Sequence, residues 1–159
     1  MFKENLLENK RILVTGGGSG LGKAMSERYL ELGAKVYICG RRKSVLEDSA
    51  KEMMDKHGGS VTPISCDIKV SEAIEEMIDQ IWSEGPLDGL VNNAAGNFIS
   101  RTEDLSPRAF NAIANIVFNG TFYTTNCVGK RWIKEGLKGS IISILTTWVY
   151  SSGPYTVPS

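Results

Sequence analysis

Histidine and cysteine are scarce in this sequence, which limits the sites that it can build. The 159 residues include one histidine, His57, and three cysteines, Cys39, Cys66 and Cys127. The cysteines are odd in number and widely spaced, which argues against a disulfide framework and against a zinc site. We expect them to be buried thiols in a reducing cytosol. His57 ends a helical pattern just before Gly58–Gly59, so we expect a helix-end role rather than catalysis.

An excess of charge and a long apolar run are also absent. Eighteen basic residues balance eighteen acidic ones, which argues against a nucleic-acid binder driven by phosphate contacts and against disorder. No apolar run approaches the ~18 residues of a membrane span. Residues 1–10 carry Glu4 and Glu8 without an apolar core, so we expect neither a signal nor a transit peptide. The expected location is cytoplasmic, with no nucleic-acid or membrane partner.

Strand and helix patterns alternate along the chain. Short runs rich in β-branched residues predict five strands, at 11–15, 35–39, 61–65, 87–92 and 140–145. Helical spacing between them predicts helices at 21–32, 44–57 (opened by a Ser44/Glu47 capping box), 71–84 (with Ser71 as N-cap) and from Ser106–Pro107 to Gly136 or Gly139. This alternation predicts an α/β fold with a doubly wound parallel sheet of Rossmann type.

The order of elements also predicts where the domain is incomplete. Pro63 cannot donate a ladder hydrogen bond, so its strand is expected at a sheet edge. The fifth strand is followed by a loop and by no covering helix, although a parallel sheet needs both faces covered. We expect residues 1–159 to form a single dinucleotide-binding domain, truncated after the fifth strand, that is the N-terminal part of a longer protein.

A glycine-rich segment, Thr15 to Gly22, joins the first strand to the first helix. Its glycines follow the spacing G-x-x-x-G-x-G over Gly16, Gly20 and Gly22. Glycines permit a tight turn, and the amide N–H groups of the helix start can face a pyrophosphate. The alternative, a merely flexible turn, does not account for the strand before it and the helix after it.

This loop resembles the TGxxxGxG fingerprint of the short-chain dehydrogenase/reductase family. A second family signature, NNAG, is similar to Asn92–Gly96, which follows the fourth strand. The resemblance covers the whole chain and implies the strand order 3-2-1-4-5. It also implies a coenzyme site whose residues are Thr15, Gly16, Gly18, Ser19, Gly20, Leu21, Gly22, Asp67, Ile68, Asn93, Ala94, Ala95 and Gly96.

The charge after the second strand predicts the coenzyme. An NAD enzyme usually places an acid there for the ribose hydroxyls, whereas this chain has Arg41 and Arg42. Arginine binds phosphate through paired donors, so we predict NADP(H), with Arg41 as the main contact to the 2′-phosphate. A solvated basic turn is the alternative.

The catalytic positions depart from the common family pattern of Asn, Ser, Tyr and Lys. Counted on the family motif, Val117 stands at the Asn position, Thr146 at the Ser position and Ser159 at the Tyr position. The Lys position lies past Ser159.

One branch of the family, the 2,4-dienoyl-CoA reductases, carries the same departures. The segment NNAAGNFIS at 92–100, Leu105–Pro107, Asn119–Thr121 and 157–159 resemble that branch. The resemblance implies an NADPH-dependent reductase of unsaturated fatty acyl-CoA thioesters that serves fatty acid β-oxidation. It further implies acyl-CoA binding at Phe98, Ser106 and Ser159. Phe98 could instead anchor its loop, and Ser106 could be a helix N-cap.

The branch's proton-donating tyrosine is replaced by Trp148, whose indole N–H is not a general acid near neutral pH. Tyr150, Thr146 or a bound water could take its place, and Thr146 and Ser159 are candidates for the polar wall of the site. Two alternatives to the dienoyl-CoA reductase stay open: another short-chain reductase of enoyl or ketoacyl thioesters, and a non-catalytic NADP-binding protein. The resemblance implies that the full-length protein is a homotetramer.

Overall fold

Five parallel strands form one sheet in the order β3-β2-β1-β4-β5. The computed structural model describes residues 2–151 and 155. The strands are β1 (Arg11–Thr15), β2 (Lys35–Gly40), β3 (Val61–Ser65), β4 (Gly89–Asn92) and β5 (Ser140–Ser143). The predicted order is confirmed, and Pro63 lies on the edge strand β3, where its missing N–H costs no ladder bond. β4 and β5 are shorter than predicted.

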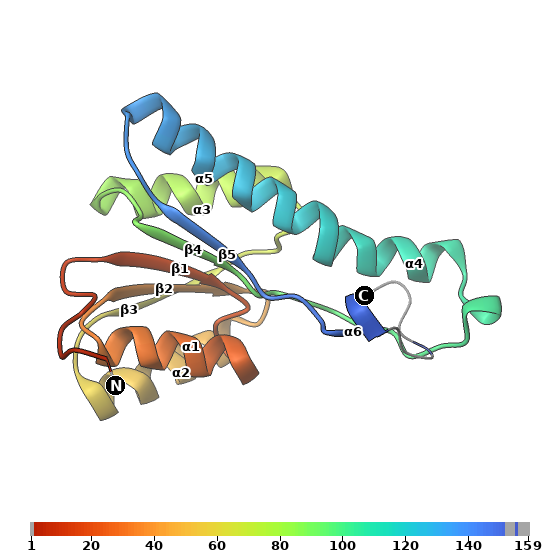
Figure 1. Cartoon of the computed structure of the whole chain (residues 1–159), viewed down its shortest axis with the longest axis horizontal. Coiled ribbons are helices and arrows are strands. Elements are labelled where there is room, and N and C mark those ends of the chain that lie inside the picture. The colour runs from red at the N-terminus through yellow and green to blue at the C-terminus, as the bar shows by residue number, and fades with distance from the viewer. Residues whose placement is uncertain (1, 152–154, 156–159) are drawn as a thin grey trace.

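The two faces of the sheet are covered by different helices (Figure 1). Alternate residues of a strand point to opposite faces. Leu13 and Tyr37 therefore pack on one side with α3 (Ser71–Glu84) and α5 (Thr121–Glu135). Val14 and Ile38 pack on the other side with α1 (Gly20–Glu31) and α2 (Lys43–His57). Both sides of β1 and β2 are buried, which explains why these strands read as continuous apolar runs.

The remaining elements lie at or beyond the carboxyl ends of the strands (Figure 1). They are the 3₁₀ turn η1 (Thr102–Asp104), helix α4 (Pro107–Ala114), the π-helical turn η2 (Asn115–Gly120) and α6 (Trp148–Ser151). The predicted long helix is thus α4, η2 and α5 in succession, with a wide turn in its middle. Its end at Gly136 is confirmed: Gly136 has φ +66°, and the N–H of Leu137 donates to the Trp132 carbonyl at 2.8 Å.

The helix starts show which capping predictions hold. Ser106 caps α4, because its Oγ accepts from the N–H of Ala109 at 3.2 Å. Ser71 is not an N-cap: the N–H of Ile74 bonds to the Val70 carbonyl, so α3 is capped by Val70, and the Ser71 hydroxyl donates to Glu72. Ser44 opens no capping box either.

α2 begins one residue earlier than predicted, with Arg42 as its cap and no side-chain cap bond. The backbone of Arg42 is extended, and its carbonyl accepts from the N–H of Leu46. That bond places Ser44 inside the first turn, where its side chain has no cap position to fill. At the other end, His57 is the last residue of α2 and lies 2.8 Å from the Glu27 carboxylate of α1. Hydrogen bonds from Lys56 and His57 lower the pKa of Glu27 to about 2.

The cysteines agree with the sequence expectation in part. All three are free; Cys39 and Cys66 are buried, whereas Cys127 is half-buried. Burial raises the pKa of the Cys66 thiol to about 11 and that of Cys39 further still. Within residues 2–151, no helix has the length and apolar character needed to cross a membrane.

Candidate coenzyme cleft

A cleft of about 380 Å³ opens at the carboxyl ends of β1, β2 and β4, the place where ligands of open α/β sheets bind. Most of the predicted coenzyme residues line it: Gly16, Gly18, Ser19, Leu21, Arg41, Arg42, Asn93, Ala94 and Ala95. These residues come from three separate loops, which the parallel sheet brings to one edge.

The glycine-rich loop has the backbone geometry of a pyrophosphate cradle. Gly16 has φ +68°, and its N–H donates to the Cys39 carbonyl at 2.8 Å, so the chain turns sharply as it leaves β1. A Cβ on Gly22 would lie 2.3 Å from the Gly16 carbonyl oxygen, so only glycine allows α1 to start this close to the loop. The amino end of α1, with its free N–H groups and positive dipole end, therefore stands beside the cleft.

Thr15 joins the two central loops rather than lining the cleft. Its side chain is buried, and its Oγ1 accepts from the N–H groups of Asn93 and Ala94, both at 3.0 Å. The side-chain amide of Asn93 in turn donates a hydrogen bond to the Thr15 carbonyl at 3.0 Å. The ends of β1 and β4 are thereby locked together, and the backbone of Asn93 and Ala94 forms a fixed wall of the cleft.

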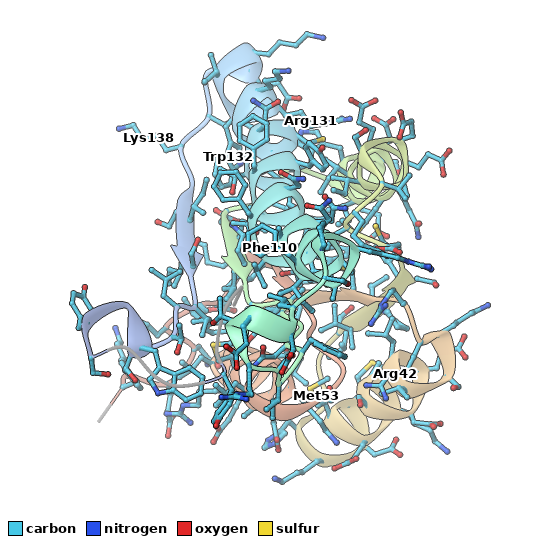
Figure 2. All side chains as sticks on the ribbon, turned by 90° about the vertical axis from the view of Figure 1, so that its right-hand side faces the viewer. Arg42, Met53, Phe110, Arg131, Trp132 and Lys138 are labelled. Atoms are coloured by element: carbon cyan, nitrogen blue, oxygen red, sulfur yellow. The ribbon has the colours of Figure 1, made fainter. Side chains whose placement is uncertain are left out.

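Arg41 and Arg42 form the basic end of the cleft. Both are exposed, and among the described residues neither takes part in an ion pair. Figure 2 looks onto the carboxyl ends of the strands and shows Arg42 at the side of α2, away from Phe110 of α4. Two guanidinium groups without carboxylate partners keep their donors available for a phosphate.

Several predicted coenzyme residues lie outside the lining. Gly20 and Gly22 belong to the start of α1. Asp67 pairs with Lys69 at 3.4 Å. Ile68 is buried against Gly120 of η2, and Gly96 packs on Ile116.

The predicted catalytic residues do not converge on the cleft. Thr146 Oγ1 accepts from the N–H of Trp148 at 3.3 Å, which opens α6. Tyr150 is 93% exposed. Ser159 lies outside the described residues. Of the predicted acyl-CoA residues, Phe98 is exposed and Ser106 is the N-cap of α4.

The family model for short chain dehydrogenases matches residues 10–152. The chain belongs to this family. Short-chain dehydrogenases are oxidoreductases, and the family implies a nicotinamide coenzyme. The five-stranded parallel sheet with flanking helices described above is the fold of this family.

Two curated relatives are similar along nearly the whole chain. A probable 2,4-dienoyl-CoA reductase 3 [(3E)-enoyl-CoA-producing] of Caenorhabditis elegans is 42% identical over 100% of this chain and 52% of its own length. A probable 2,4-dienoyl-CoA reductase [(2E)-enoyl-CoA-producing] of Bacillus subtilis is 37% identical over 96% of this chain and 60% of its own length. The chain therefore spans about half the length of these relatives.

A solved structure agrees with the architecture. The crystal structure of a short chain dehydrogenase from Bacillus anthracis superposes with a TM-score of 0.90 at 41% sequence identity, and the match covers 95% of this chain and 61% of that chain. The similarity thus extends from the sequence to the arrangement of strands and helices.

Part of the cleft lining was not predicted from the sequence. The additional lining residues are Cys39, Gly40, Val45 and Leu46. Val45 and Leu46 are adjacent apolar residues of α2 in the sequence, but helical spacing alone does not distinguish packing on a sheet from packing on a loop. Burial keeps the Cys39 thiol protonated by raising its pKa, which makes it a wall and not a nucleophile.

Proposed function

We propose that this chain binds NADP(H) in the cleft and forms the coenzyme-binding part of a reductase of unsaturated acyl-CoA thioesters, of the 2,4-dienoyl-CoA reductase type. The observation that supports it best is one opening framed by the amino end of α1 on one side and by the unpaired Arg41 and Arg42 on the other. A phosphate cradle and a guanidinium pair that line one opening suit a dinucleotide with an additional phosphate.

Each wall of the cleft would hold a different part of the coenzyme. The amides between Gly18 and Leu21 would bind the pyrophosphate, and Arg41, helped by Arg42, would bind the 2′-phosphate. Asp67 and Ile68 would contact the adenine, and the segment from Asn93 to Gly96 would support the adenosine side. When bound, the reduced coenzyme supplies a hydride.

The acyl side would be built from the elements beyond the sheet. Phe98 and Ser106 would contact the acyl-CoA, and Ser159 would join them from outside the described residues. We propose Tyr150 as the proton donor and Trp148 as an apolar wall. α6 begins five residues after β5 ends and therefore lies at the carboxyl edge of the sheet, as the proposal requires (Figure 1).

The coenzyme proposal is tested by titrating the intact protein with NADPH and with NADH. We expect NADPH to bind roughly ten- to a hundredfold more tightly, the typical worth of a charge-assisted phosphate contact. Arg41→Ala should remove most of this preference. Arg28→Ala is the matched control, because Arg28 lies on α1, pairs with Glu31 and does not line the cleft. Equal affinities in the unmodified protein would refute the NADP(H) assignment.

A second candidate is a non-catalytic NADP-binding protein, which Val117 and Trp148 at two catalytic positions favour. The two candidates are separated by assaying NADPH consumption with a 2,4-dienoyl-CoA. Binding without consumption would support the second candidate. An enoyl or ketoacyl thioester consumed in place of the dienoyl substrate would indicate another short-chain reductase.

We also propose that the full-length protein is a homotetramer located in the cytoplasm. The apolar side chains along the long helix support assembly: Phe118 of η2 is 73% exposed, and Phe122 and Ile133 of α5 are exposed as well. Exposed apolar stripes of this kind mark interaction surfaces. Sedimentation of the full-length protein measures the assembly.

A further inference from the structure

A buried serine of α2 holds the glycine-rich loop. Ser49 is 6% exposed, and its Oγ donates to the carbonyl of Gly18 at 2.7 Å, across 31 positions of sequence. Leu46 packs beside this bond, one turn earlier: a Cβ on Gly18 would lie 2.9 Å from Leu46 Cδ2. α2 and the loop are therefore in direct contact, with a single directional bond that fixes how they meet.

This bond constrains an amide at the cleft. In a trans peptide the C=O and N–H groups point in opposite directions. The Gly18 carbonyl is held toward α2, so the N–H of Ser19, which belongs to the same peptide unit, is held away from α2. Ser19 lines the cleft. Without the serine hydroxyl, the peptide that follows the conformationally permissive Gly18 would lose its preferred orientation, and the Gly18 carbonyl would lose its protein partner.

The same bond joins the glycine-rich loop to the helix that begins after the arginine pair. Arg42 is the N-cap of α2, and Ser49 follows it by about two helical turns. Contact between Ser49 and Gly18 therefore constrains how far the start of α2, at Arg42, lies from the loop. A dinucleotide that carries an additional phosphate must meet both ends of the cleft at once, so its binding depends on this distance.

We propose that Ser49 is a positioning residue for the coenzyme, which orients the Gly18–Ser19 peptide and sets the spacing between the glycine-rich loop and the arginine pair. The inference rests on the proposed NADP(H) function. It predicts that loss of the hydroxyl weakens NADPH binding more than NADH binding, because only NADPH engages both ends of the cleft fully.

The test compares coenzyme affinities of Ser49 variants of the intact protein, measured by calorimetric titration. Ser49→Ala should weaken NADPH binding about tenfold and NADH binding about threefold, as expected for one buried hydrogen bond. Ser49→Thr keeps the hydroxyl and should stay within about twofold of the unmodified protein. Ser49→Cys, a weak donor of similar size, should give an intermediate loss and replaces Ser49→Ala if that variant does not fold.

The control is Thr124→Val. Thr124 is fully buried in α5, on the other face of the sheet, and its Oγ1 donates to the Gly120 carbonyl at 2.8 Å. Both substitutions remove one buried hydroxyl, so both should lower the melting temperature, but Thr124→Val should leave the two affinities unchanged. Affinities of Ser49→Ala within twofold of the unmodified protein, or equal losses for the two coenzymes, would overturn the inference. If the unmodified protein binds neither coenzyme, the proposed function fails first and the inference fails with it.

Discussion

At the residue scale, the structure separates side chains that build the cleft from those that only border it. Thr15 and Asn93 bond to each other's backbone, and Ser49 bonds to the backbone of Gly18. None of these bonds can be read from residue spacing, because each joins segments that are distant in sequence. Arg41 and Arg42, by contrast, could be assigned to the cleft from the sequence. They follow the second strand directly, and the carboxyl ends of parallel strands share one edge.

The proton donor is also a question at this scale. Tyr150→Phe removes only a hydroxyl from a side chain that is 93% exposed, so the melting temperature should not change. If Tyr150 is the general acid, turnover of a dienoyl thioester at saturating NADPH should fall about 10²- to 10⁴-fold. Trp148→Phe is the companion variant and should keep most of the turnover, since an indole is not an acid near neutral pH. Unchanged turnover in Tyr150→Phe would move the assignment to Thr146 or to an ordered water.

At the scale of elements, the sequence predicted the strands well and the helix termini less well. Strand positions follow from apolar runs and from Pro63, which are local signals. No local signal predicted the π-helical turn η2. Its last residue, Gly120, contacts Ile68, which is distant in sequence, so closely that a Cβ on Gly120 would lie 2.7 Å from Ile68 Cδ1. Leu21, which the family resemblance places at the coenzyme site, is 69% exposed and lines the cleft. It belongs to the first turn of α1, which stands at the sheet's edge beside the glycine loop.

The turn from α5 to β5 depends on one close approach. The Trp132 indole N–H donates to the Leu87 carbonyl at 2.6 Å, and a Cβ on Gly139 would lie 2.2 Å from the same ring. Gly139→Ala should therefore lower the free energy of unfolding by about 1–3 kcal/mol, the usual cost of overpacking. Gly129→Ala is the matched control: its Cβ would meet nothing within 4 Å, and it lies inside α5. It should raise stability by about 0.5–1 kcal/mol. Equal effects of the two variants in urea titrations would contradict this account of the turn.

At the scale of the whole molecule, the covering of the sheet is uneven. α1 and α2 cover one face of β1, β2 and β3, while α3 and α5 cover the other face (Figure 1). On the face covered by α1 and α2, an apolar cleft of about 420 Å³ lies beside β4 and β5. Its lining includes Leu7, Ile12, Val91 and Ile142. Like β3 on the opposite side, β5 is an edge strand of the sheet, and its isoleucines are exposed.

This uneven covering predicts that the 159-residue chain alone associates. An exposed apolar edge strand offers unpaired backbone groups to a second copy. Sedimentation velocity across a dilution series should therefore show species larger than a monomer.

Ile142→Lys places a charge on β5, at a residue that is 51% exposed, and should shift the distribution toward monomer. Ile133→Lys places the same charge on α5, at a residue that is 82% exposed, and should have the smaller effect if the strand is the contact. A larger effect of Ile133→Lys would assign the association to the long helix instead. A monomer at every concentration would show that β5 and its cleft need no partner.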